Sequence, residues 1–154
     1  MATPFPFQIF QLPDRVLFVF EGGAHMWRTI FTDGRAHPKD PNPSFLGDSI
    51  GRWDGDTLVV DVSNFNGRTW LDMSANFVDE NEHVLERFTL LDRDTILYEA
   101  TVADPTVFVK PVEMRFTLKR VPPEQQILEY SCLEGERSLQ HYTVEDGGRK
   151  QRQR

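Results

Sequence analysis

The sequence contains a single cysteine, Cys132, among its 154 residues. One cysteine excludes an internal disulfide and any metal cluster held by several thiolates. No apolar run approaches the roughly 18 residues that a membrane-spanning helix needs. The first residues, Met1 to Phe7, show neither the basic nor the apolar region of a signal peptide. We therefore expect a cytoplasmic chain, or a periplasmic or secreted one from which a signal was removed.

Positive charge is also scarce. Lys and Arg number 17 against 24 Asp and Glu, which gives a formal net charge of −7. Nucleic acids and anionic membranes would repel such a chain at long range, so we expect neither as a partner. Familiar catalytic motifs are missing as well: there is no Gly-x-Ser-x-Gly elbow and no phosphate-binding glycine-rich loop before a helix.

The composition that remains is that of a folded, aromatic-rich domain. Hydrophobic residues make up 39% of the chain and charged residues 27%, and Phe alone occurs 12 times. A chain of this length suits one domain with a real core. We expect a single domain over residues 1–148, followed by a disordered basic tail over residues 149–154.

The segment from Gly47 to Asn66 predicts the centre of the fold. Its Asp54-Gly55 dipeptide favours the tight turn that joins two antiparallel strands. The arm from Thr57 to Val62 is rich in β-branched residues and apolar on both faces, as in a strand covered on two sides. The sequence therefore predicts a β-hairpin within the core.

Turn signals and alternating apolar residues predict further strands on either side of this hairpin. Together with its two arms, they give about nine strands, the others covering residues 7–12, 15–21, 25–32, 83–91, 95–102, 112–121 and 126–134. A stiff proline-rich loop is expected over residues 35–45, and a lid or binding loop over residues 67–82. The predicted fold is an all-β, antiparallel up-and-down β-barrel or half-barrel of lipocalin or calycin type.

Three stretches resemble a known family. They are Asp33-Gly34-Arg35-Ala36-His37-Pro38, the run from Gly47 to Asp61, and the sequence Phe65-Asn66 followed by Thr69-Trp70-Leu71-Asp72. They are similar to a family of small uncharacterised proteins of soil bacteria that share the core GRWEGDTLVVDT.GFN..TWLD. Further matches lie at residues 83–88, 104–105 and 129–132, so the resemblance covers nearly the whole chain.

The resemblance implies no particular activity, because none is established for the family. Many of its members carry a signal peptide. Where members often read G.PHS after the Trp-Leu-Asp, this chain has Ser74-Ala75-Asn76-Phe77-Val78. A histidine of that loop is therefore missing here, together with any role that it has in relatives.

Glu86 is the first candidate for catalysis. It shares one strand face with Val84, Phe88 and Leu90, so we expect its carboxylate inside the barrel. Burial would raise its pKa toward the range useful for a general acid or base. The structural alternative is an internal ion pair with an arginine, for which Arg28, Arg52 and Arg115 are the candidates.

Two histidines and one aspartate complete the predicted catalytic set. His25 lies on the strand face of Trp27 and Phe31, and His83 opens the strand that carries Glu86. With Asp72 they would line one mouth of the barrel, although a lone histidine is more often a hydrogen-bonded structural residue. No local metal-binding spacing occurs, so we expect neither a metal nor a cofactor.

Aromatic and arginine side chains supply the expected ligand contacts. Trp70 lies on the long loop and suits a lid over an apolar ligand, or else a plug that fastens the loop to the barrel end. Trp27, Arg52 and Tyr130 are the other expected ligand-binding residues. Asp48, Arg52 and Asp61 are expected to form a charge network of structural rather than catalytic character.

These observations favour a cofactor-free lyase, isomerase or cyclase that acts on a small apolar or aromatic molecule within the barrel. Glu86 or His83 would move a proton, and Arg28 would steady developing negative charge. A non-catalytic, lipocalin-like binding protein is the first alternative. A metal-dependent oxygenase or hydrolase that uses His25, His83 and a carboxylate is the second. Either a monomer or a homodimer fits the sequence.

Overall fold

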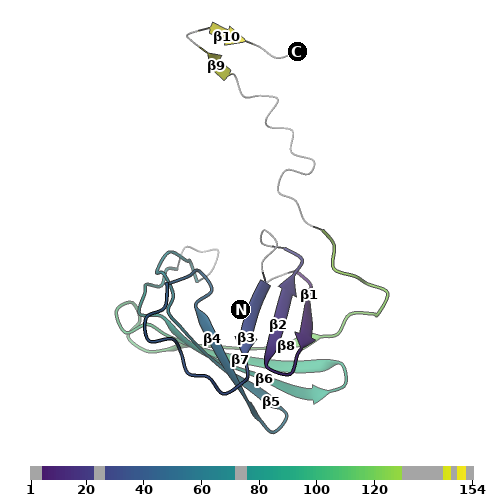
Figure 1. The fold of residues 1–154 in the computed structure, drawn as a ribbon. Coiled ribbons are helices and arrows are strands. Elements are labelled where there is room, and N and C mark those ends of the chain that lie inside the picture. Colours follow the sequence, from purple (N-terminus) through teal and green to yellow (C-terminus); the bar gives the residue numbers. More distant parts are fainter. Residues whose placement is uncertain (1–4, 23–26, 72–75, 130–143, 147–148, 152–154) are drawn as a thin grey trace.

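The computed structural model describes residues 5–22, 27–71, 76–129, 144–146 and 149–151. Within these ranges the chain forms strands, turns and loops, with one large curled sheet and a separate two-stranded sheet near the C-terminus (Figure 1). In the same ranges, no helix has the length and apolarity to cross a membrane. The all-β class predicted from the sequence is confirmed.

Eight strands form the large sheet, in which every strand pairs with its neighbours in chain order. They are β1 (Phe7–Gln11), β2 (Arg15–Phe20), β3 (Trp27–Phe31), β4 (Asp48–Asp54), β5 (Thr57–Ser63), β6 (His83–Asp92), β7 (Thr95–Ala103) and β8 (Val112–Lys119). The sheet curls into a half-barrel and leaves β1 and β8 as its two edges. The predicted barrel or half-barrel thus takes the half-barrel form.

Two segments near the C-terminus differ from the sequence prediction. Residues 126–129 form no strand, because Pro122 and Pro123 lead into turns and extended chain; the rest of the strand predicted over 126–134 lies outside the described residues. Within the segment predicted as a disordered tail, β10 (Arg149–Gln151) pairs with β9 (Val144–Asp146).

One pair of strands departs from the up-and-down pattern. β3 and β4 run parallel and share a single register pair, Phe31 with Ile50, whereas all other neighbours in the large sheet are antiparallel. The proline-rich loop between them turns the chain so that the first residues of β4 lie beside the last residues of β3 and run in the same direction. This parallel arrangement joins β1–β3 to β4–β8 and is called the seam below.

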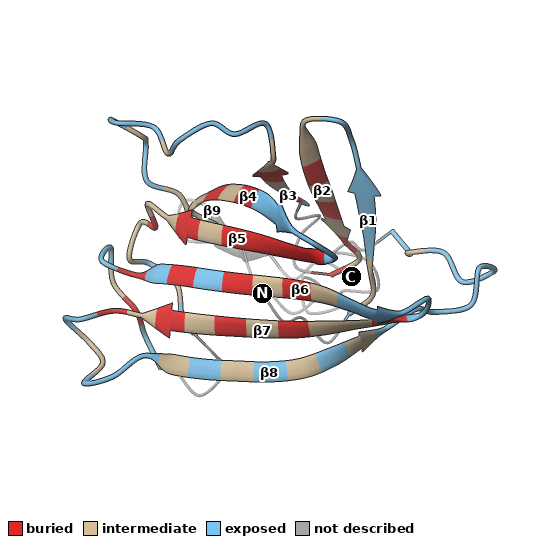
Figure 2. Ribbon diagram, turned by 90° about the horizontal axis from the view of Figure 1, so that it is seen from below, coloured by how far each residue is buried: buried red, intermediate tan, exposed pale blue. Residues whose placement is uncertain are grey.

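The predicted central hairpin is β4 and β5. Asp54 pairs with Thr57 across the turn, and Gly55 has a φ of 59°, a conformation that glycine adopts without strain. β5 is buried along most of its length (Figure 2). It also lies between β4 and β6, so both its backbone edges and both its faces are covered, as the sequence predicts.

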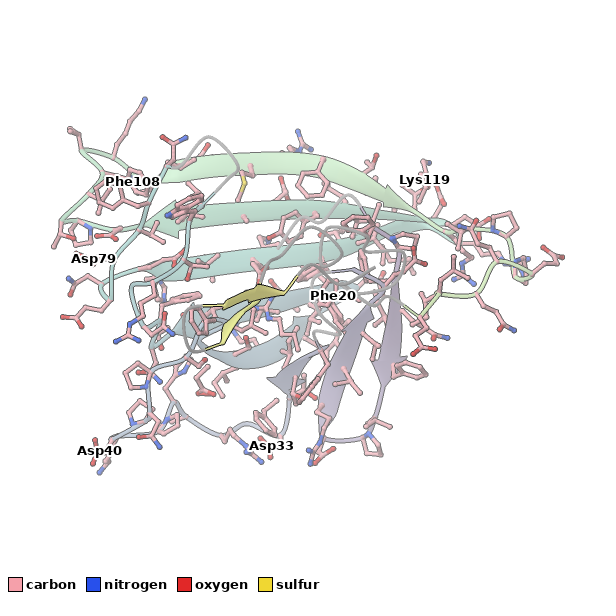
Figure 3. The ribbon with its side chains drawn as sticks, turned by 90° about the horizontal axis from the view of Figure 1, so that it is seen from above. Phe20, Asp33, Asp40, Asp79, Phe108 and Lys119 are labelled. Atoms are coloured by element: carbon pink, nitrogen blue, oxygen red, sulfur yellow. The ribbon has the colours of Figure 1, made fainter. Side chains whose placement is uncertain are left out.

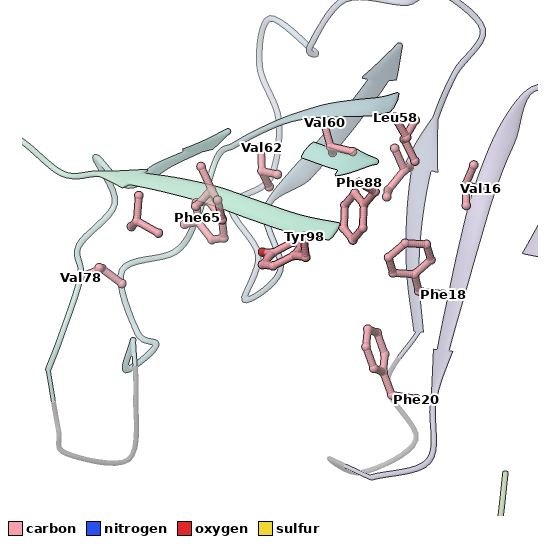
Figure 4. Packing of buried hydrophobic residues seen from close by; sticks show 14 residues of the cluster. Val16, Phe18, Phe20, Leu58, Val60, Val62, Phe65, Val78, Phe88 and Tyr98 are labelled. Carbon is pink, nitrogen blue, oxygen red and sulfur yellow. The ribbon is translucent and has the colours of Figure 1, made fainter. Parts of the chain in front are cut away.

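The core fills the concave side of the sheet (Figure 4). A chain of aromatic contacts crosses it, with ring centroids 5.4 Å apart for Phe18 and Phe88, 4.9 Å for Phe88 and Tyr98, and 4.9 Å for Tyr98 and Phe116. These contacts link β2, β6, β7 and β8, and they fix the curvature on which the pocket depends.

The described parts of the long loop, residues 67–71 and 76–82, lie beside each other. Trp70 and Phe77 form an isolated antiparallel bridge between these two parts. Asp79 lies at the same end of the sheet as Phe108, and Lys119 lies at the opposite end (Figure 3). The loop therefore covers one end of the concave face.

Candidate functional site

A pocket of about 190 Å³ opens beneath the long loop on the concave side of the sheet. Apolar side chains make up most of its wall: Phe45, Leu46, Val62, Phe65, Trp70, Leu71, Val78, Val84, Val102 and Met114. Five polar residues also line it: Arg28, Thr69, Glu82, Glu86 and Tyr98. A mostly apolar cavity with a few converging polar groups is the usual form of a small-molecule site.

Arg28 and Glu86 form a buried ion pair in the pocket wall. Arg28 Nη1 and Nη2 donate to the two Glu86 carboxylate oxygens at 3.0 and 2.5 Å. Arg28 Nε donates to Ser49 Oγ at 3.0 Å, and the Tyr98 hydroxyl donates to Glu86 Oε1 at 2.8 Å. The four side chains connect strands β3, β4, β6 and β7 into one hydrogen-bonded network.

The network confirms that Glu86 faces the interior, and it shows the alternative considered for this residue, an internal ion pair with Arg28. Burial acts to raise the Glu86 pKa, yet the neighbouring positive charge and hydrogen bonds, those of Arg28 first among them, together lower that pKa to about 2. Burial and the neighbouring Glu86 carboxylate raise the pKa of Tyr98 far above its usual value. Near neutral pH, Glu86 stays ionised and Tyr98 stays protonated.

Glu82 is the carboxyl in the pocket whose chemistry fits proton transfer. The residue as a whole is 8% exposed, and among the described residues no hydrogen bond or ion pair holds its carboxyl group, whose oxygens are not among the fully buried polar atoms and which lines the pocket. Burial, followed by the nearby charge of Asp104, raises the Glu82 pKa to about 7. A carboxyl with such a pKa exchanges protons readily near neutral pH.

Asp104 is the carboxyl group whose charge acts on Glu82, and its own pKa is shifted in the opposite direction. It is 1% exposed, and its carboxylate accepts hydrogen bonds from the Asp79 and Thr106 backbone N–H groups at 2.8 and 3.1 Å and from the Thr106 hydroxyl at 2.6 Å. Although burial opposes them, these bonds lower the Asp104 pKa. Two neighbouring carboxyl groups with separated pKa values are a common acid–base arrangement in enzymes.

Thr69 contributes an unsatisfied group to the pocket wall. Its hydroxyl oxygen is buried without a hydrogen-bond partner, and no other buried side-chain polar atom in the described part of the chain is in this state. A buried polar group left without a partner costs about 1–3 kcal/mol. The oxygen has almost no exposed surface, so a molecule in the pocket does not contact it in this structure.

A second polar cluster lies on the opposite, convex face of the sheet. His37 Nδ1 contacts Asp48 Oδ2 at 3.1 Å, and His37 Nε2 contacts Asp61 Oδ1 at 2.9 Å. His83 Nε2 lies 3.1 Å from both Asp61 oxygens, and Ser63 Oγ lies 3.3 Å from His37 Nδ1. Through these contacts His37 connects the proline-rich loop to β4 and β5.

Two sequence predictions, one for His83 and one for the charge network of Asp48, Arg52 and Asp61, differ from the arrangement seen in the convex cluster. His83 is on the face of β6 opposite Glu86, because it lies an odd number of positions from that residue, so the structure does not bring the two together. The predicted charge network of Asp48, Arg52 and Asp61 is also different: the aspartates contact histidines, while Arg52 is exposed on β4. The residue that contacts both Asp48 and Asp61 is His37, where the sequence analysis expected Arg52.

The remaining predicted site residues divide into three groups. Trp70 lines the pocket, as expected. Trp27 is 65% exposed and lies on a shallow outer groove with Leu12, on the face of β3 opposite Arg28. Arg52 does not line the pocket. The predictions for His25, Asp72 and Tyr130 lie outside the described residues.

Sequence reasoning missed Glu82 as a site residue, although a signal was present. The alternation that places Val84 and Glu86 inside also places Glu82 inside when it is extended two residues back from the strand. Two other residues gave no such signal. Thr69 and His37 lie on loops whose sequences show no regular alternation of apolar and polar residues. Their positions depend on how those loops fold back onto the sheet.

Within the described residues, no three His, Cys, Asp or Glu side chains are arranged to hold a metal ion. Comparison of the chain with protein-family models, with curated proteins and with solved structures gives no match. The half-barrel, its pocket and the polar groups in its wall are therefore the basis for assigning a function.

Proposed function

We propose that this protein is an enzyme of the lyase, isomerase or cyclase type that uses general acid–base catalysis without a cofactor. Its substrate is a small apolar or aromatic molecule bound in the concave pocket. One observation carries the proposal: a Glu82 carboxyl without a partner among the described residues lies in the wall of a mostly apolar pocket. Glu82 thus takes the role that the sequence suggested for Glu86.

The chemistry is a proton shift. The ionised Glu82 carboxylate removes a proton from a carbon next to an existing double bond of the substrate. The electron pair of that C–H bond forms a new double bond with the adjacent atom, and the π pair of the existing double bond moves to its far atom. Glu82, now neutral, returns the proton to that far atom, which completes a 1,3-proton shift. The Glu82 pKa of about 7 keeps both forms accessible near neutral pH, which is the condition for an efficient general base and acid.

The buried ion pair serves this chemistry as a scaffold. Arg28 and Glu86 satisfy one another, so they fix the pocket wall and leave Glu82 as the group that moves the proton. Trp70 lies at the open side of the pocket, and the loop that carries it limits access of water to the bound molecule.

A binding protein without catalysis is the second candidate. The observation that favours it is the mutual satisfaction of Arg28 and Glu86, because two groups that the sequence suggested for chemistry are occupied by each other. In this case the pocket would hold an apolar ligand, and Glu82 would only shape its polarity. Binding without any acceleration of proton transfer is the result expected for this alternative.

Proton exchange from a simple ketone tests the proposal without knowledge of the natural substrate. Deuteration of the acetophenone methyl group in D₂O is followed by proton NMR with the wild-type protein, Glu82→Gln and Glu113→Gln. Glu113 is an exposed carboxylate on the outer face of β8, which makes it a matched control. We expect exchange to be accelerated by the wild type and by Glu113→Gln, and reduced by roughly 10²–10⁴ in Glu82→Gln. Equal rates for all three proteins, with folding intact, would reject the acid–base role.

A further inference from the structure

The size of the pocket limits what it can hold. A cavity of about 190 Å³ is slightly larger than the roughly 150 Å³ that accommodates a benzene molecule in a protein interior. A single ring with a short substituent fits this space, whereas fused ring systems and long acyl chains exceed it. Phe45 and Trp70 line the pocket and are 58% and 67% exposed, so they present aromatic surface to such a ring.

Glu82 is the carboxyl group of the pocket wall that an entering molecule can bind. Among the described residues it has no hydrogen bond or ion pair, and its oxygens are not among the fully buried polar atoms. The other carboxylate in the wall, Glu86, already accepts hydrogen bonds from Arg28 and Tyr98. A ligand that donates a hydrogen bond therefore finds its acceptor in Glu82.

The charges around Glu82 favour a donor that is itself positively charged. The influences that shift the Glu82 pKa are burial and the charge of Asp104, and both raise it. The positive charge that lowers the pKa of Glu86 is not among the influences on Glu82. When Glu82 is ionised, this part of the pocket is therefore negative and has no counterion among the described residues. A protonated nitrogen on the ligand supplies one, and the aromatic faces of Phe45 and Trp70 attract cations as well.

A positively charged nitrogen also suits the proposed proton shift. Glu82 removes a proton from the carbon next to a C=N⁺ bond of the ligand. The electron pair of that C–H bond forms a C=C bond, and the π pair of the C=N⁺ bond moves onto the nitrogen, which becomes neutral and takes the proton back from Glu82. The ligand nitrogen thus receives the electron pair, so the step requires no positively charged side chain beside Glu82.

We propose that the pocket binds small organic cations that consist of one ring and a protonated nitrogen, and that the Glu82 carboxylate pairs with this nitrogen. The substrate class is then that of protonated imines and related nitrogen compounds. The inference rests on the proposed function for the direction of the chemistry, but the binding of a cation can be measured without turnover.

Two probes of the same shape separate the effect of charge from that of apolar burial. Benzylamine is protonated at neutral pH, whereas benzyl alcohol is neutral and also donates a hydrogen bond. Dissociation constants are measured by ligand-observed NMR titration at pH 8 and pH 5.5 for the wild type, Glu82→Gln and Glu113→Gln. Glu113→Gln removes one negative charge from an exposed position on β8, so it controls for the change in net charge.

At pH 8 we expect the wild type and Glu113→Gln to bind benzylamine about tenfold more tightly than benzyl alcohol, as for one charge-assisted hydrogen bond partly exposed to water. At pH 5.5 Glu82 is mostly neutral, because its pKa is about 7, so this ratio should fall close to one. Glu82→Gln should show a ratio close to one at both pH values and should bind benzyl alcohol as the wild type does.

Three results would overturn the inference. The first is equal binding of the two probes by the wild type at pH 8, and the second is a preference for benzylamine that survives in Glu82→Gln or is unchanged at pH 5.5. The third is that neither probe binds.

The two proposals fail in different ways. If proton exchange from acetophenone depends on Glu82 while the two probes bind equally, the ligand class is wrong and the proposed function stands. If the preference for benzylamine depends on Glu82 while proton exchange is unaffected by Glu82→Gln, the pocket binds cations as inferred but does not catalyse proton transfer.

Discussion

Arg28 and Glu86 lie 58 positions apart in the chain and meet in two hydrogen bonds inside the half-barrel. Arg28 comes from β3 and Glu86 from β6, so the pair spans the seam as well as the central hairpin. Both side chains are almost completely buried, at 5% and 2% exposure. The pair therefore joins the two parts of the sheet where backbone pairing is weakest.

Glu86→Gln should lower the free energy of unfolding by on the order of 3–5 kcal/mol, because it leaves the buried Arg28 charge without its counterion. Urea denaturation monitored by circular dichroism measures this change. The double variant Arg28→Met with Glu86→Leu removes both charges and should be more stable than Glu86→Gln alone. An unaltered urea midpoint for Glu86→Gln would contradict the structural role of the pair.

The raised pKa of Glu82 predicts a dependence of stability on pH. Its ordinary value is 4.5 and its folded value about 7, so the folded state binds more protons than the unfolded state between these values. Stability is therefore lost as pH rises through this window. Glu82→Gln should match the wild type at pH 4 and be more stable by about 1–3 kcal/mol at pH 8, which is the free energy equivalent to the pKa shift at about 1.4 kcal/mol per unit, reduced for the partial solvent exposure of the carboxyl group. Parallel unfolding curves at the two pH values provide the measurement, and a constant difference would refute the assignment.

The lowered pKa of Glu86 predicts that stability falls as the pH becomes acidic, which is the opposite of the trend for Glu82. The folded Glu86 pKa of about 2 lies below the ordinary value of 4.5, so its contribution to stability is complete above pH 4.5 and disappears as pH falls toward 2. The wild type should therefore lose stability steeply over this range. Glu86→Gln should show a shallower slope between pH 4.5 and pH 2, and identical slopes in acid titrations followed by fluorescence would argue against the lowered pKa.

Gly67 fixes the loop that covers the pocket. Its φ is 65°, and a Cβ atom at this position would lie 2.8 Å from the Glu80 backbone nitrogen. Gly67→Ala should cost about 2–5 kcal/mol from conformational strain and overpacking together, and it should weaken acetophenone binding. Gly34→Ala is the matched control: its φ is 81° and the added Cβ meets nothing within 4 Å, so thermal unfolding should show a smaller loss.

His37 holds the proline-rich loop against the convex face. Its two ring nitrogens contact Asp48 and Asp61, which lie on β4 and β5. His37→Ala should cost only about 1 kcal/mol, since partly exposed ion pairs contribute little, but the loop should become more accessible. Trypsin should then cleave after Lys39 several-fold faster than in the wild type. His83→Ala, which removes a contact to Asp61 without releasing the loop, should leave this rate unchanged.

Local sequence patterns were sufficient to predict much of the fold. The Asp54-Gly55 turn and the apolar faces of Thr57 to Val62 predicted the central hairpin, and the phase of β6 placed Glu86 inside. These features depend on residues that are close in the chain. The parallel pairing of β3 with β4 could not be predicted in the same way, because it depends on the path of the loop between them.

The site was less predictable because its chemistry depends on distant partners. Whether Glu86 is an acid, a base or half of an ion pair is decided by Arg28, which a strand pattern does not place beside it. Glu82 gains its raised pKa partly from Asp104, a residue that follows β7. Pattern alone therefore located a carboxylate in the interior but could not identify which one retains a titratable proton near neutral pH.

The seam also determines where the sheet opens first. β5 and β6 are hydrogen-bonded along both edges, whereas the backbone pairing of β1–β3 with the remaining strands is limited to one parallel register pair. Segments with few backbone hydrogen bonds to the rest of a protein open at a lower free energy, so amide exchange should be faster in β1–β3 than in β5–β7. Such an opening exposes the unpaired edge of β4 to other molecules. Self-association during storage would then depend on how often the first three strands detach, even in solutions where almost every molecule is folded.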